Sequence, residues 1–202
     1  MSGIIAQNSG RHTGLVKAAS AGGEWTLIST VTSDGSDDSL SFTSGIDSTY
    51  DEYCFKLINI HPENDNAELT FNLSTDGGSN YNATKTSTSF YAYHFEDDSA
   101  VALAYDTGHD LAQGTGYQYL LENCGYDNDQ ASSGYLHLFN PSGTTFVKHF
   151  LTRMSNGHAL SINVDEYVSG YANTTSAVDA IDFKYNAGEI QAGSISLYGI
   201  GW

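Results

Sequence analysis

The chain has 202 residues, a length at which one domain is the usual arrangement and folding buries most of the surface of the unfolded chain. Its 24 acidic and 7 basic residues give a net charge of −17, and such a surface repels phosphate backbones and anionic lipids. We therefore expect no nucleic-acid partner. No apolar run is long enough to cross a membrane and no secretory signal opens the sequence, so we expect a protein made in the cytoplasm without a membrane span.

The first 23 residues differ from the rest in charge. They carry +2 and the remainder carries −19, and their apolar residues follow neither a helical nor a strand period. Residues 1–23 are therefore predicted to form an extended arm that docks on a neighbouring subunit or on a host structure through two cations and two apolar pairs. A frayed terminus is the alternative. The expected docking residues are Ile4, Ile5, Arg11, Leu15, Val16 and Lys17.

From residue 24 onward, short alternating apolar segments separated by turns predict β-strands. The chain has 14 Tyr and 9 Phe against 2 Pro, a composition typical of half-buried pleated surfaces. A brief helix is conceivable only at 99–105. About ten strands at this spacing predict one all-β domain over 24–202, an antiparallel sandwich of jelly-roll type. The expected strands are 25–31, 39–42, 53–60, 69–73, 90–95, 117–121, 135–139, 146–151, 181–185 and 194–200.

The sequence contains neither a nucleophile elbow nor a phosphate-binding loop, and we predict no catalytic residue and no cofactor. The two cysteines, Cys54 and Cys124, are expected to be free thiols. Carboxylates gather in three loops and are weak Ca²⁺ candidates, although an acidic chain also places solvated charge in loops. These candidates are foremost Asp34, Asp37 and Asp38, then Glu96, Asp97 and Asp98, and then Asp127 and Asp129.

Several segments resemble a domain of structural proteins from marine tailed bacteriophages. The similar segments lie in the first and last parts of the chain, whereas the middle, about 90–170, matches nothing. The resemblance implies a virion setting and a β-sandwich fold, and it assigns no binding residue. The segments are 4–11, 25–30, 46–53, 57–62, 73–78, 181–184 and 193–200.

Together these observations predict a non-enzymatic virion structural protein, either a tail fibre or appendage subunit or a capsid-decoration subunit. It would be made in the host cytoplasm and attached to other virion proteins, of the capsid or of the tail, through its arm. We expect a homo-oligomer, because an edge-rich sandwich with a long arm seldom stays alone, and the resemblance implies a trimer, since phage appendages are usually threefold. A carbohydrate-binding module for a host surface glycan is the alternative and could coexist with the first function. A sandwich-fold glycan hydrolase is a third reading.

Overall fold

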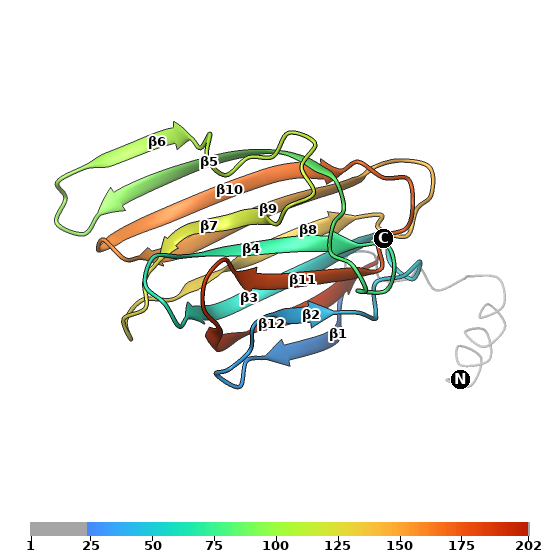
Figure 1. Ribbon diagram of the computed structural model, residues 1–202, viewed down its shortest axis with the longest axis horizontal. Helices are drawn as coiled ribbons and strands as arrows, with labels where there is room; N and C mark the ends of the chain where they lie inside the picture. Colours follow the sequence, from blue (N-terminus) through green and yellow to red (C-terminus); the bar gives the residue numbers. More distant parts are fainter. Residues whose placement is uncertain (1–23, 202) are drawn as a thin grey trace, which may run out of the picture.

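The computed structural model describes residues 24–201, which contain twelve β-strands and no helix. Every strand pair is antiparallel, which confirms the predicted all-β antiparallel sandwich (Figure 1). The docking residues predicted in the arm lie outside the described residues. The strands are β1 (Trp25–Thr32), β2 (Leu40–Phe42), β3 (Glu52–Pro62), β4 (Ala67–Ser74), β5 (Lys85–Phe95), β6 (Val101–Tyr105), β7 (Gln118–Cys124), β8 (Ser132–Phe139), β9 (Lys148–His158), β10 (Ile162–Ala172), β11 (Ala180–Tyr185) and β12 (Ile190–Ile200).

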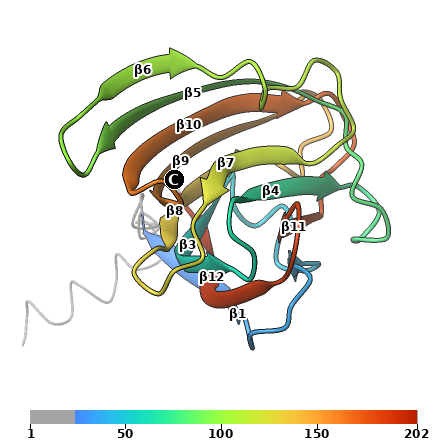
Figure 2. The ribbon, with the colours of Figure 1, turned by 60° about the vertical axis from the view of Figure 1, so that its left-hand side comes forward.

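The strands form two facing sheets of unequal width. The larger runs in the order β1-β12-β3-β8-β9-β10-β5-β6, and the smaller in the order β7-β4-β11-β2. A single residue pair, Cys124 with His158, joins β7 to β9 at one corner. The hairpin of β5 and β6 extends the larger sheet beyond the smaller one (Figure 2).

The core lies between the two sheets, because alternate residues along their strands direct apolar side chains into this space. Four fully buried phenylalanines meet at its centre, with ring centroids 5.1 to 6.3 Å apart in the contacting pairs. Burying each such side chain contributes roughly 1.5–3 kcal/mol, so this cluster holds the two sheets together. The four are Phe55, Phe71, Phe150 and Phe183.

The structure corrects two sequence expectations. Residues 101–105 form the edge strand β6, not a helix, because Ala102 and Ala104 lie opposite Tyr93 and Tyr91 of β5. Strand β10 was not predicted at all, although it pairs along its whole length with both β5 and β9. Both predicted free cysteines are buried and unpaired, and no helix long and apolar enough to span a membrane occurs in residues 24–201.

One lysine is buried beside the core. Lys85 has no solvent exposure, and its Nζ donates hydrogen bonds to Asn72 Oδ1 and to the Ala83 carbonyl. Burial lowers the pKa of this amine from 10.5 to about 7. Because the unfolded chain keeps the Lys85 proton up to about pH 10.5 and the folded chain only to about pH 7, folding releases a proton between these values and stability rises with pH there.

The Lys85→Met variant should therefore be more stable than the wild type, and most clearly at low pH. Its advantage in free energy of unfolding should shrink by on the order of 2 kcal/mol between about pH 6 and about pH 9. Urea unfolding at several pH values measures this. The exposed Lys56→Met is the control and should show no such trend. An advantage of Lys85→Met that is constant across this range would contradict a buried, neutralised amine.

Candidate functional site

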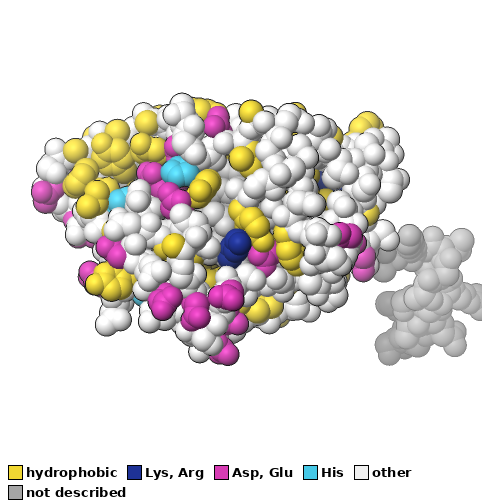
Figure 3. Space-filling model, viewed as in Figure 1, with side chains coloured by type: hydrophobic (Ala, Val, Ile, Leu, Met, Phe, Trp, Pro, Cys, Tyr) yellow, Lys and Arg dark blue, Asp and Glu magenta, His cyan; other side chains and the backbone are white. Residues whose placement is uncertain are grey.

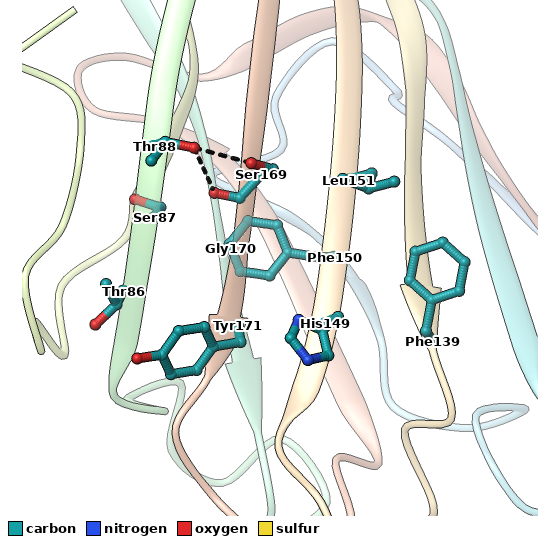
Figure 4. Close-up of a pocket in the computed structure, with 10 residues that line it drawn as sticks. All are labelled: Thr86, Ser87, Thr88, Phe139, His149, Phe150, Leu151, Ser169, Gly170 and Tyr171. Carbon is teal, nitrogen blue, oxygen red and sulfur yellow. Dashed lines mark hydrogen bonds between the residues drawn. The ribbon is translucent and has the colours of Figure 1, made fainter.

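The outward face of the larger sheet carries a row of depressions across β8, β9 and β10. The first has a volume of about 490 Å³ and is bordered by the exposed His149 and Leu151 of β9 and by Phe139 of β8. On β5 and β10, Thr88 and Ser169 lie beside it, and their hydroxyl oxygens are 2.8 Å apart (Figure 4). Tyr171 packs near His149, with ring centroids 5.9 Å apart. Aromatic rings and hydroxyl groups thus face solvent together.

Two further depressions continue the first one along the strands. The second shares Phe139 and Leu151 with the first, and the third shares Tyr135 and Arg153 with the second. Their volumes are about 380 and 390 Å³. We name this continuous feature the outer trough. Its outward side chains are Thr86, Thr88, Ser133, Tyr135, His137, Phe139, His149, Leu151, Arg153, Ser155, Asn163, Asp165, Tyr167, Ser169 and Tyr171.

The far end of the outer trough is polar and held by an ion pair. Arg153 donates two hydrogen bonds to the Asp165 carboxylate, at 3.0 and 2.8 Å, and its guanidinium lies 5.1 Å from the centre of the Tyr167 ring. The Tyr167 hydroxyl donates to Asp165 at 2.9 Å. The hydrogen bonds from Arg153 lower the pKa of Asp165. These contacts fix charged and hydroxyl groups at the surface.

A second group of functional side chains lies on the inward side of β10. Strand β4 supplies Glu68, β7 supplies Glu122, β10 supplies Glu166, and the β6–β7 loop supplies Asp106 and His109. We name these five residues the inner acidic cluster. Viewed from the smaller sheet, Figure 3 shows a histidine with acidic side chains beside it, next to a group of hydrophobic side chains.

His109 is the centre of the inner acidic cluster. Its Nδ1 contacts Asp106 Oδ2 and lies 3.8 Å from Glu122 Oε2, while Nε2 is 3.2 Å from Glu68 Oε1. Burial alone would lower the pKa of His109, but the hydrogen bonds and charges of Asp106 and Glu68 outweigh it and raise that pKa.

Glu166 is the most buried carboxylate of the inner acidic cluster, with no solvent exposure. Its Oε2 accepts a hydrogen bond from the Glu122 amide at 3.3 Å, and its Oε1 has no partner. Burial, together with the charge of Glu122, raises the pKa of Glu166 to about 8. Burial and the charge of Asp106 raise the pKa of Glu122 as well.

The predicted Ca²⁺ loop is organised differently. Asp34 Oδ1 accepts hydrogen bonds from the amide and hydroxyl of Ser36, and Asp37 Oδ2 accepts one from the Asp34 amide. The first two carboxylates therefore stabilise their own turn. Within residues 24–201, these residues and Asp38 do not form a group of three potential metal ligands, whereas Asp106, His109 and Glu166 do.

One feature of the sequence indicates the inner acidic cluster, although we did not predict the cluster from it. In β10, Glu166 takes the inward position between Val164 and Val168, where an apolar side chain is the rule. A charged residue inside such an alternation marks a buried ionisable group. The other four members come from separate elements, and only the fold brings them to Glu166.

Comparisons with protein-family models, with curated proteins and with solved structures found no significant match to this chain.

Proposed function

We propose that this chain is a non-enzymatic subunit of a bacteriophage virion that binds an extended glycan of the host surface through the outer trough. The virion setting rests on the sequence resemblance. The glycan rests on one observation, the continuous row of three depressions that combines exposed aromatic rings with fixed hydroxyl, amide and charged groups.

Sugar rings have the two kinds of surface that the outer trough complements. Their apolar C–H faces pack on aromatic side chains, here Tyr135, Phe139 and Tyr171, and their hydroxyls exchange hydrogen bonds with polar side chains. The trough follows β10 from Asn163 to Tyr171, about 26 Å at about 3.3 Å per residue, a length that suits several linked sugars. Because the groups sit on paired strands, little ordering is needed on binding.

We favour binding over hydrolysis because each carboxylate that lines the outer trough already contacts a basic side chain. Those lining the outer trough are Glu52, which contacts His137, and Asp165, which is ion-paired with Arg153. Neither is a free acid or base for a glycosidic bond. Glu166 lies on the opposite side of the sheet without solvent exposure, so a glycan in the outer trough cannot reach it.

We infer further that the sandwich is a jelly roll enlarged by two hairpins. The pairings β1-β12-β3-β8 and β2-β11-β4-β7 are nested in the way that two interleaved Greek keys produce. The hairpins β5–β6 and β9–β10 then widen one sheet, and β9 and β10 carry most of the outer trough. A crystal structure with a different strand order would contradict this.

The Tyr171→Ala variant of the full-length protein should lose roughly 10- to 100-fold in affinity for the glycan, because one aromatic packing surface is removed from the outer trough. A bacterial-surface glycan array would identify the ligand, and calorimetry with the purified oligosaccharide would give the affinities. Tyr126→Ala removes a tyrosine that is 51% exposed and lies outside the trough, so it should bind as the wild type does.

Three results would contradict glycan binding in the outer trough. Equal weakening by Tyr171→Ala and Tyr126→Ala, or no effect of Tyr171→Ala on a glycan that does bind, would contradict the outer trough as the site. A second copy of the chain occupying the trough would appear as an oligomer that Tyr171→Ala dissociates, and that also contradicts glycan binding there.

For attachment to the virion we propose residues 1–23, with Ile4, Ile5, Leu15 and Val16 dominating over Arg11 and Lys17. Burying an aliphatic side chain contributes roughly 1.5–3 kcal/mol, whereas an exposed ion pair contributes about 0–1 kcal/mol. We also propose a trimer, and the open edge strand β6 supports association because Val101 and Leu103 are 66% and 73% exposed. Several arms in one oligomer would strengthen attachment.

A protein beginning at Glu24 should melt at the same temperature as the full chain but fail to attach to particles that lack it, since strands within residues 24–201 build the core described for that range. Differential scanning calorimetry and sedimentation with the particles measure the two properties. Normal attachment of the shortened protein would contradict the arm as an anchor. Light scattering that finds only monomers of the full chain would contradict the trimer.

A further inference from the structure

The inner acidic cluster places three potential metal ligands around one point. The ligand atoms of Asp106, His109 and Glu166 all lie within 4.8 Å of one another. Asp106 and His109 are held by a tight turn in which the Gly108 amide donates to Asp106 Oδ1 at 3.0 Å. Glu166 is held by the two neighbours of β10. Rigid elements thus position all three.

The unpaired oxygen of Glu166 is a second and independent observation. A carboxylate oxygen with no exposure and no hydrogen-bond partner is costly in a folded protein. Among residues 24–201, a single ion pair involves a Lys or Arg side chain, that of Arg153 with Asp165, and it lies outside the inner acidic cluster. No Lys or Arg in this range is therefore ion-paired with a carboxylate of the cluster. Three carboxylates therefore surround one imidazole beside the buried Glu166 carboxyl, and a cation that displaces the Glu166 proton would satisfy all four acidic groups.

The carboxylates around His109 indicate that Nδ1 is the ring nitrogen that would bind a metal ion. Nε2 donates to Glu68, and Nδ1 faces Asp106 and Glu122, so without its proton the Nδ1 lone pair would point at two carboxylates. A lone pair facing carboxylate oxygens is repulsive unless a proton or a metal ion lies between them. In metal sites, the histidine nitrogen that does not bind the metal usually donates its N–H to a carboxylate, which orients the ring. Glu68 has this position next to Nε2.

We propose that Asp106, His109 and Glu166 bind one divalent transition-metal ion, with Glu68 orienting the histidine. The imidazole ligand favours Zn²⁺ or Mn²⁺ over Ca²⁺, which takes oxygen ligands. The ion would tie the β6–β7 loop to β10. It is a structural site on the inward side of β10, and it does not depend on the function proposed for the outer trough.

The test uses the full-length protein without an affinity tag, stripped with EDTA and titrated with ZnCl₂ or MnCl₂ in a calorimeter. The expected result is one ion per chain and a higher melting temperature with the metal than without it. Glu166→Gln, which keeps the size of the side chain, should abolish binding. Glu68→Gln should weaken it by about 10- to 100-fold, as expected for a group that orients a ligand.

Two controls separate this site from surface binding and from misfolding. His94→Gln removes the histidine of an exposed pair with Asp98, 3.1 Å apart, and should leave the binding unchanged. Circular dichroism of the metal-stripped variants checks that each one folds. If Glu166→Gln does not fold, Asp106→Asn takes its place in the metal titration. Folded wild type that binds neither ion, or binding lost in His94→Gln but kept in Glu166→Gln, would overturn the proposal and leave His109 as a protonated ion-pair partner.

Discussion

The uninterrupted pairing of β10 is the constraint on which both candidate sites depend. All eleven of its residues pair with β5 on one side and with β9 on the other, without a bulge. Because successive side chains of a strand point to opposite faces, this register alone decides that Glu166 points inward and that Tyr167 and Tyr171 point outward. A slip of one residue would exchange the two sets and destroy the outer trough and the inner acidic cluster together.

The two faces of β10 are chemically different because they meet different neighbours. The inward face packs against the smaller sheet, where Val164 and Val168 join the apolar interior and Glu166 meets the other carboxylates. The outward face has no covering layer within residues 24–201, so Tyr167 and Tyr171 remain accessible. The packed core thus supplies a rigid support, and the uncovered face supplies the groups of the proposed glycan site.

The sequence predicted the architecture well where alternation was regular. Leu69, Phe71 and Leu73 all lie in the core, as their spacing indicated, and the antiparallel sandwich followed from such strands. Strand β10 was missed because Glu166 and Gly170 interrupt its inward apolar positions, so the period of two was not apparent. The five residues of the inner acidic cluster come from three strands and one loop that are widely separated along the chain. Their proximity depends on strand pairing, which local patterns do not encode.

The proposed glycan site requires β10 to present alternate residues on its outward face. Single cysteines placed at positions 163 to 169 and at 171 test this directly, since the native Cys54 and Cys124 are buried and should label slowly. We expect a thiol reagent to modify cysteines at the outward positions 163, 165, 167, 169 and 171, and bound glycan to protect them, while 164, 166 and 168 stay unreactive. Labelling without alternation, or outward positions that the bound glycan leaves unprotected, would contradict the account.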